Sequence, residues 1–170
     1  MKALGNALLT LALAFPGATA FAGNSIRNFH EVTDTFFRSG RLETRDFDAL
    51  EDLGVKTILS LESDGRRSSA IRQEEQLAAD HGITFLRVPM HETHKPTLEQ
   101  INAALALVTD TDNQPILVHC YHGQDRTGIV AAAYRIRYQD WSIADATAEL
   151  KELGHAPALY WWDDVLADVD

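Results

Sequence analysis

The most constraining feature of this sequence is a short polar loop between an apolar strand and a helix. The apolar run at residues 116–119 leads into Cys120, and Arg126 follows after five intervening residues, at the start of a predicted helix. A loop of this length lets the backbone curl with successive N–H groups pointing inward, and the helix adds the positive end of its dipole. The pattern therefore predicts a loop that binds an oxyanion such as phosphate.

The residue types in this loop suit phosphate chemistry. Arg126 can donate two parallel hydrogen bonds to two phosphate oxygens, a geometry that lysine lacks. A cysteine beside a helix N-terminus and a cation is largely thiolate, the nucleophilic form. We therefore expect Cys120 to face phosphorus, with His119 supporting the loop through hydrogen bonds and the Thr127 hydroxyl near the sulfur. The alternative is a cysteine that only fills the core.

The loop resembles the signature of the protein tyrosine phosphatase superfamily, which is His-Cys, five residues, Arg, and then Ser or Thr. His119 and Thr127 complete this pattern. Gly123 stands three residues after the cysteine as in the family, and Gly128 fits the frequent Arg-Thr-Gly ending. The resemblance is to the compact bacterial dual-specificity and phytase-like branch of that superfamily.

A second stretch extends this resemblance. Residues 36–41, Phe-Phe-Arg-Ser-Gly-Arg, look like the opening of the compact dual-specificity and phosphoinositide branches, and the match covers residues 33–155. The resemblance implies that the cysteine attacks phosphorus to form phosphocysteine, which water then hydrolyses. It implies neither a metal nor another cofactor. The expected substrate-binding residues are Tyr121, His122, Gly123, Gln124, Lys95 and Arg38.

The general acid is less clear from the sequence. In the family it is usually an aspartate on a mobile loop before the phosphate-loop strand, and the corresponding stretch here, residues 88–96, contains no aspartate. Glu92 stands between the two prolines of this stretch and is the favoured acid. Asp125 is the rival, because the myotubularin branch has an aspartate at that loop position for which an acid role is proposed. His91 and His94 are further candidates at low pH.

The first residues resemble a targeting segment. An apolar stretch at residues 7–15 is followed by small-residue triplets that end at Ala20 and Ala22. This is typical of a secretory signal peptide, too short to cross a bilayer, which takes about 20 apolar residues. We expect residues 1–22 to be removed after Ala20 or Ala22, and residues 23–170 to form one periplasmic or secreted domain without a membrane span. The alternative is a terminal helix packed on the domain.

Charge and cysteine content narrow the partners. Asp and Glu total 25 against 15 Lys and Arg, so the formal net charge is −10. Nucleic acid is not expected, because a basic surface is the footprint of that interaction. A phosphorylated small molecule or phosphopeptide is expected, bound by local positive charge. With one cysteine, no internal disulfide forms and no resolving thiol is present. We expect a monomer.

Strands and helices alternate along the chain, which predicts an α/β fold with a mostly parallel central sheet flanked by helices, as in protein tyrosine phosphatases. The apolar run at 116–119 indicates a strand buried on both faces. Thr97 and Gln100 form a predicted capping box. The other expected strands are 35–38, 55–61 and 83–88, and the expected helices are 44–53, 68–82, 98–108, 126–138, 142–153 and one from Pro157.

Substrate and reaction class leave alternatives open. Two substrate classes are about equally favoured, inositol polyphosphates and phosphotyrosine or other aryl phosphates. Export and the charge of His91, His94 and Lys95 favour inositol polyphosphates. The acidic composition opposes the strongly basic pocket that such substrates need. A sulfur-transfer enzyme such as rhodanese is opposed by loop spacing, which is typically four residues there. A non-catalytic phosphate-binding module and a dual-specificity phosphatase acting on phosphoproteins are the remaining alternatives.

Overall fold

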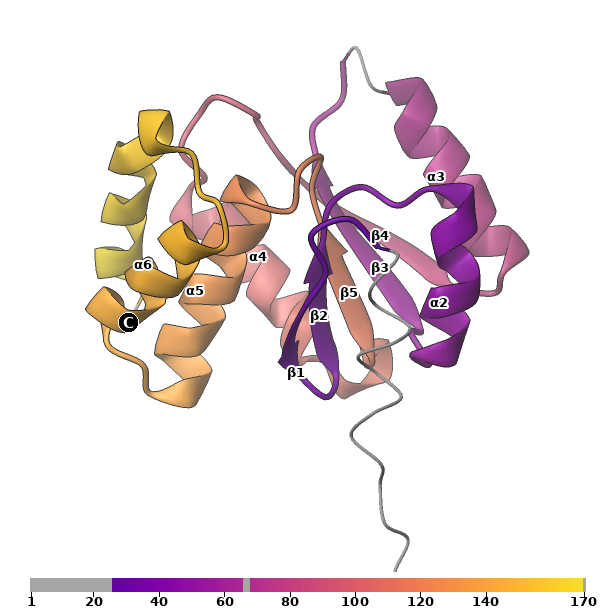
Figure 1. The fold of residues 1–170 in the computed structure, drawn as a ribbon, viewed down its shortest axis with the longest axis horizontal. Coiled ribbons are helices and arrows are strands. Elements are labelled where there is room, and N and C mark those ends of the chain that lie inside the picture. Colours follow the sequence, from indigo (N-terminus) through magenta and orange to yellow (C-terminus); the bar gives the residue numbers. More distant parts are fainter. Residues whose placement is uncertain (1–25, 66–67, 170) are drawn as a thin grey trace, which may run out of the picture.

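The structure is a computed structural model that describes residues 26–65 and 68–169, so the predicted signal peptide lies outside the described residues (Figure 1). A single five-stranded sheet has the order β1-β2-β5-β3-β4. β1 and β2 are antiparallel, and all other neighbours are parallel. The predicted α/β fold with a mostly parallel sheet is confirmed. The strands are β1 (His30–Thr33), β2 (Phe36–Ser39), β3 (Thr57–Glu62), β4 (Thr84–Met90) and β5 (Ile116–His119).

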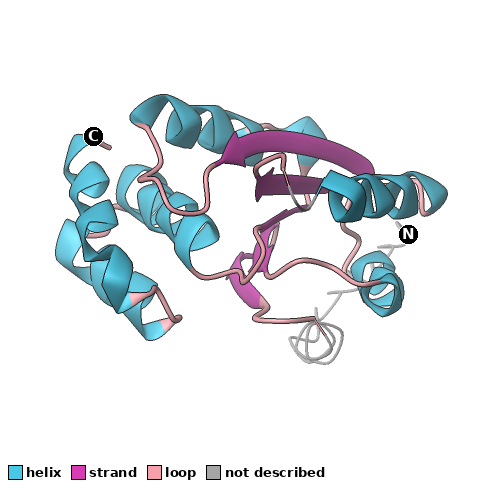
Figure 2. Cartoon of the chain, turned by 90° about the horizontal axis from the view of Figure 1, so that it is seen from above, coloured by secondary structure: helices cyan, strands magenta, loops and turns pink. Residues whose placement is uncertain are grey.

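Helices cover both faces of this sheet. The two helical layers lie on opposite sides of the sheet (Figure 1), and Figure 2 shows the C-terminal helices gathered at one end of the molecule, beside the sheet. Helix α2 (Phe47–Asp52) and helix α3 (Ser68–Asp80) form the first layer. The second layer contains α4 (Leu98–Thr109), α5 (Asp125–Gln139) and α6 (Ile143–Glu152). Short 3₁₀ helices are η2 (Thr44–Asp46), η3 (Thr111–Asn113) and η4 (Pro157–Asp168).

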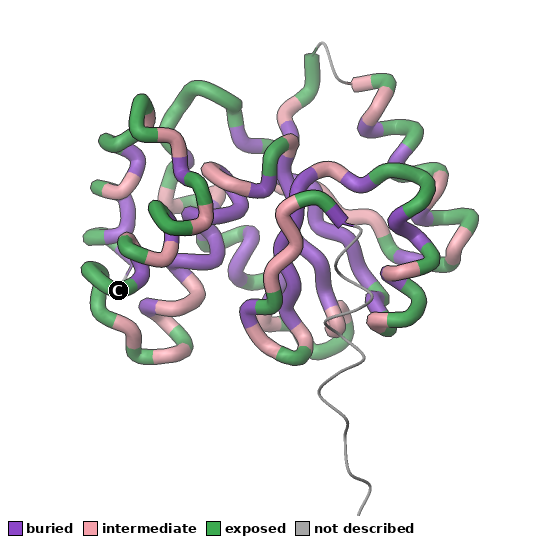
Figure 3. Tube along the Cα trace, viewed as in Figure 1, coloured by how far each residue is buried: buried purple, intermediate pink, exposed green. Residues whose placement is uncertain are grey.

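The central strand β5 is buried on both faces, as predicted. Because successive side chains of a strand point to opposite faces, Leu117 joins the core under α2 and α3, whereas Ile116 and Val118 join the core under α4 and α5. The colouring by burial shows the central strands β2, β5 and β3 buried and the outer turns of the helices exposed (Figure 3). A strand covered on both sides holds the end of its chain in a fixed place, and that end begins the predicted phosphate loop.

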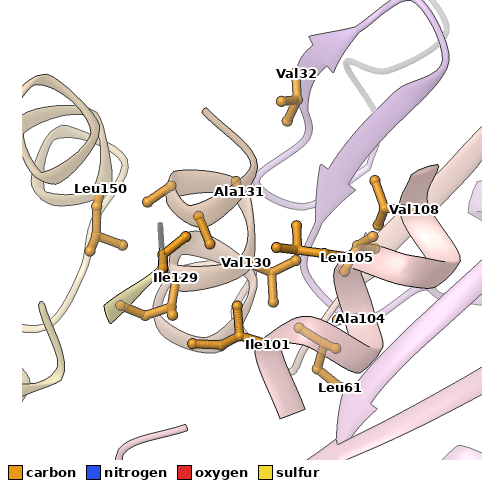
Figure 4. Packing of buried hydrophobic residues seen from close by; sticks show 14 of the residues in the cluster. Val32, Leu61, Ile101, Ala104, Leu105, Val108, Ile129, Val130, Ala131 and Leu150 are labelled. Carbon is orange, nitrogen blue, oxygen red and sulfur yellow. The ribbon is translucent and has the colours of Figure 1, made fainter. Parts of the chain in front are cut away.

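Helix α5 is the centre of the larger core. Ile129, Val130 and Ala131 are fully buried, because the sheet, α4 and α6 enclose the helix. In Figure 4, Val130 lies beside Leu105 of α4. Leu150 of α6 faces the opposite side of α5, where Ile129 lies. A helix that is apolar around most of its circumference is a core helix. The loop between β5 and α5 is therefore anchored at both ends by buried elements.

Several local predictions are confirmed and others are corrected. The capping box of α4 forms: the Gln100 N–H donates to Thr97 Oγ1 at 3.2 Å. Strand β1 was not expected, because its four residues include only one that is buried. The helix expected at 44–53 begins as a 3₁₀ turn, and the segment after Pro157 is 3₁₀ as well. No helix of the described residues is long and apolar enough to span a membrane.

Candidate active site

The predicted phosphate loop lies at the carboxyl edge of the sheet. Strand β5 ends at His119, which pairs in register with Ser39 of β2 on one side and Ser60 of β3 on the other. Residues 120–124 then cross to α5, which begins at Asp125. The ends of parallel strands are where α/β folds usually bind ligands. The strand-to-helix arrangement predicted for this loop is confirmed.

The sulfur of Cys120 points into the curl of this loop. The Gly123 N–H donates to Cys120 Sγ at 3.3 Å, and Cys120 is 2% exposed because the loop surrounds it. Gly123 has φ 77°, and a Cβ there would lie 2.4 Å from the carbonyl carbon of Ser39. Only glycine fits a loop that turns this tightly against β2. Thr127 is fully buried, and its Oγ1 makes no hydrogen bond within the described structure.

Arg126 extends across the sheet edge at the start of α5. Its Nη1 donates to the carbonyl oxygens of Leu61 at 3.4 Å and Met90 at 3.2 Å, at the ends of β3 and β4. The side chain is therefore fixed in place, and the residue is 5% exposed. Both bonds use Nη1, which leaves Nε and Nη2 to form the two-pronged contact that phosphate oxygens accept.

A cleft with a volume of about 460 Å³ opens beside this arginine. Arg126 and Glu92 both line it, so the structure brings the predicted phosphate ligand and the favoured general acid to one cavity. Glu92 is exposed on the loop between β4 and α4. The full lining is Glu62, Ser63, Asp64, Gly65, His91, Glu92 and Arg126.

Asp125, the rival acid, does not line this cleft. Its Oδ1 lies 2.8 Å from Nδ1 of the buried His155 and accepts a 2.8 Å hydrogen bond from the Ala156 N–H. Burial alone would raise the pKa of Asp125, but the His155 contact and the Ala156 N–H outweigh it, so the pKa is lowered. A carboxylate held as an anion lacks the proton that a general acid donates. The assignment of the acid remains a prediction, and this geometry supports Glu92.

The other predicted substrate ligands lie outside the cleft lining. Arg38 is 1% exposed and donates through Nη2 to the Gly123 carbonyl at 2.8 Å, so it lies behind the loop. Tyr121 is half-buried, with the guanidinium groups of Arg27 and Arg41 5.3 and 5.0 Å from its ring centre. Such cation–π contacts hold the ring at the outer wall of the loop. The remaining residues are Lys95 and His122, both exposed, and Gln124, which is half-buried.

A buried charged network under the loop was missed from the sequence. His119 Nε2 lies 3.4 Å from Glu74 Oε1, and both side chains are almost completely buried. Arg41 Nε donates to Glu62 beside them at 2.8 Å. Burial raises the pKa of Glu74, although His119 and the N–H of Leu42 oppose that shift. His119 therefore approaches α3, whereas the sequence prediction gave it a role within the loop.

The same network does not fit a metal ion. Ligand atoms of Glu62, Glu74 and His119 lie within 4.8 Å of one another. However, Arg41 already neutralises Glu62 with a two-pronged ion pair, so a cation placed there would meet the guanidinium charge. The network serves as an ion-paired support for the end of β5.

Comparison with known proteins agrees with this geometry. The tyrosine phosphatase family model matches residues 25–158. Dual specificity protein phosphatase TpbA of Pseudomonas aeruginosa is 30% identical over 128 residues, which is 75% of this chain and 54% of TpbA. Inositol diphosphatase DSP4 of Arabidopsis thaliana is 29% identical over 135 residues, 77% of this chain and 66% of DSP4. The chain thus spans about half to two thirds of the length of these curated relatives.

A solved structure shows the same fold. The core catalytic domain of the PP-IP phosphatase SIW14 from S. cerevisiae, crystallised with citrate, superposes with a TM-score of 0.74 at 26% identity. The superposition covers 85% of this chain and 86% of that chain. The likeness therefore extends over most of the chain.

The Asp125–His155 pair predicts how stability changes with pH. Burial alone would lower the pKa of His155, but the hydrogen bond to Asp125 outweighs burial, so the pKa is raised above its ordinary value of 6.5. The pair therefore contributes its full stability below about pH 6.5 and loses it as the pH rises through the raised pKa of His155 in the folded protein. Asp125, with its lowered pKa, keeps its contribution until strongly acidic pH. We expect the free energy of unfolding to fall as the pH rises above about 6.5, and to fall less in His155→Gln, as measured by urea denaturation. Parallel pH profiles for the two proteins would contradict this.

Proposed function

Because the chain belongs to the tyrosine phosphatase family, we propose that it is an exported cysteine-dependent phosphatase that hydrolyses phosphate monoesters through a phosphocysteine intermediate. The observation that carries the proposal is the loop itself. It holds the Cys120 sulfur against the Gly123 N–H and places Arg126 at the side of a cleft. These are the nucleophile and the charge stabilisation that phosphoryl transfer needs.

In the proposed first step, Cys120 Sγ attacks phosphorus. The S–P bond forms while the P–O bond to the leaving group breaks, and Glu92 gives its proton to the departing oxygen. Arg126 binds two of the non-bridging oxygens, and the loop N–H groups bind the rest of the developing charge. The result is a phosphocysteine, an alcohol or phenol, and an ionised Glu92.

In the proposed second step, water replaces sulfur on phosphorus. The Glu92 carboxylate takes a proton from the attacking water, the S–P bond breaks, and inorganic phosphate forms. The departing sulfur carries negative charge. Thr127 supports this step, because its buried hydroxyl has no other hydrogen-bond partner within the described residues and comes directly after Arg126. The cycle needs no metal ion.

The favoured substrate is phosphotyrosine or another aryl phosphate. Three carboxylates, Glu62, Asp64 and Glu92, line the cleft together with Arg126. Arg87 contacts Asp64 at 3.0 Å, and Arg41 neutralises Glu62. A wall of this kind accepts one phosphate at the arginine but attracts a second phosphate weakly. A single phosphate on a neutral carrier fits it better than a polyphosphate does.

Inositol polyphosphate is the second candidate substrate. DSP4 is named an inositol diphosphatase and SIW14 a PP-IP phosphatase, and both resemble this chain. His91, which lines the cleft, lies against His94 with ring centres 4.1 Å apart, and Lys95 follows. The positive charge of Lys95 on this loop would attract a substrate that carries several phosphates.

The proposed location is the periplasm or the cell exterior. It is supported by the apolar stretch at residues 7–15 and the small-residue triplets before residue 23. A phosphatase outside the cytoplasm would act on exported phosphoproteins or on nutrient phosphate esters. We also propose that the domain acts as a monomer.

A substrate panel tests the proposed activity. We expect the protein to hydrolyse p-nitrophenyl phosphate, and Cys120→Ser to show only background release because the nucleophile is gone. Among natural esters, kcat/KM for a phosphotyrosine peptide should exceed that for a phosphoserine peptide and for inositol hexakisphosphate. The readout is phosphate release, with Cys120→Ser as the blank for each substrate.

The outcomes of this panel are distinct. An inactive wild-type protein that still binds inorganic phosphate would support the non-catalytic binding module. Preference for inositol hexakisphosphate would overturn the favoured substrate and leave the cysteine mechanism in place. Equal activity of Cys120→Ser would overturn the mechanism.

Leaving-group dependence tests the general acid. Glu92→Gln should lower kcat/KM for phenyl phosphate by about 100-fold or more, because its leaving oxygen needs a proton in the first step. The same variant should lose much less kcat/KM on p-nitrophenyl phosphate, whose phenolate leaves unaided. Asp125→Asn serves as the matched carboxyl-to-amide change and should affect both substrates alike. Full activity of Glu92→Gln on phenyl phosphate, with a selective loss in Asp125→Asn, would transfer the role to Asp125.

A further inference from the structure

A part of the chain that is distant in sequence donates hydrogen bonds to the carbonyl oxygens of the phosphate loop, on the side away from the expected anion. The Tyr121 carbonyl accepts from the Arg41 N–H and from Arg27 Nη1, each at 3.3 Å. The His122 carbonyl accepts from Asn28 Nδ2 at 3.3 Å. Two consecutive loop carbonyls thus accept hydrogen bonds on the side that faces the protein. The donors are Arg27 and Asn28, which precede β1, and Arg41, which follows β2.

Arg38 supplies the strongest of these contacts. Its Nη2 donates to the Gly123 carbonyl at 2.8 Å and approaches the Gln124 carbonyl at 3.5 Å. Asn28 Nδ2 also donates to the Gly123 carbonyl, at 3.1 Å, and the Asn28 side-chain oxygen lies 3.0 Å from His30 Nε2. The peptide between Gly123 and Gln124 is therefore fixed from two directions.

The burial of Arg38 is costly and calls for a reason. The residue is 1% exposed, and its Nε and Nη1 have no partner within the described residues. Burial lowers the pKa of Arg38 to about 10, which still leaves it charged at neutral pH. A buried cation with unsatisfied donors destabilises a fold. Such a residue is expected mainly where it serves a functional site.

Peptide geometry indicates that purpose. In a trans peptide, the C=O of one residue and the N–H of the next point in opposite directions. Arg38 holds the Gly123 carbonyl behind the loop, while the Gly128 N–H, at 3.0 Å, and Arg38 together hold the Gln124 carbonyl. The N–H groups of Gln124 and Asp125 therefore point to the other side, where an oxyanion would bind. The guanidinium also places a positive charge directly behind those N–H groups.

We propose that Arg38 is a positioning residue that sets the direction of the loop peptides, with Asn28 in support, and so creates the oxyanion site that Arg126 completes. Arg38 acts through the Gly123 and Gln124 carbonyls and does not touch the substrate. The catalytic part of this inference rests on the proposed function, whereas the anion-binding part does not.

Anion affinity tests the inference without turnover. Calorimetry would measure the binding of tungstate, an oxyanion that resembles phosphate, to the Cys120→Ser protein. Adding Arg38→Met should weaken binding about tenfold or more, because a charged donor to the loop is lost. Arg38→Lys should recover part of the affinity, because an ammonium group can still donate to the Gly123 carbonyl. Asn28→Ala should cause a smaller loss.

Val108→Ala is the matched control. Val108 is fully buried near the C-terminal end of α4, and the Gln114 side chain before β5 bonds to its carbonyl, so it lies at the sheet edge opposite the loop. This variant should lose stability and keep tungstate affinity, which separates a structural defect from a positioning defect. In the protein that retains Cys120, Arg38→Met should lower kcat/KM for p-nitrophenyl phosphate by a factor similar to the loss of tungstate affinity.

The inference is overturned if folded Arg38→Met binds tungstate as tightly as its parent. It is also overturned if Arg38→Lys and Arg38→Met lose affinity equally and Asn28→Ala loses none. If Arg38→Met does not fold, Arg38→Lys and Asn28→Ala decide the question by the same measurement. If tungstate affinity depends on Arg38 but the wild-type protein hydrolyses nothing, the proposed function fails and this inference stands.

Discussion

A loop can bind a phosphoryl group through its backbone only if its carbonyl oxygens are satisfied on the side away from the anion. Here that condition is met by donors that reach the loop from Arg27, Asn28 and Arg38. The buried strand β5 and the buried helix α5 fix the two ends of the loop, and Gly123 turns it tightly against β2. The proposed nucleophile, the proposed anion site and the position of Arg126 all depend on this single arrangement.

The overall acidity of the chain does not prevent such a site, because carboxylates near the loop are neutralised locally. Glu62 is paired with Arg41, Asp64 with Arg87, and Asp125 with His155. Pairing at contact distance cancels charge far more effectively than a distant excess of negative charge can act through water and salt. A formal net charge of −10 therefore coexists with a loop suited to an anion.

Features with local signals could be predicted from the sequence. The spacing of Cys120 and Arg126 between an apolar run and a helix predicted the loop. The capping box of Thr97 and Gln100 predicted the start of α4. Glu92 was found by its place between two prolines, and it lines the same cleft as Arg126. Strand β1 gave little signal, because Val32 is its only buried residue.

Features that depend on distant contacts could not be predicted. The donors Arg27 and Asn28 are 94 or 95 positions from the carbonyls they bond, and nothing in either stretch points to the other. Arg38 was expected to bind substrate, whereas its side chain lies behind the loop. The partner of Asp125 was equally hidden, since His155 approaches it only after α6 packs on α5.

We propose that residues 120–126 enclose a phosphoryl group that is transferred to the Cys120 sulfur and then to water. The most direct measurement is mass spectrometry of protein quenched in acid within milliseconds of mixing with p-nitrophenyl phosphate. We expect one phosphoryl group on the peptide that contains Cys120, on the sulfur itself, and none in Cys120→Ser. Release of p-nitrophenol without any phosphorylated cysteine, or a phosphoryl group on another side chain, would contradict it.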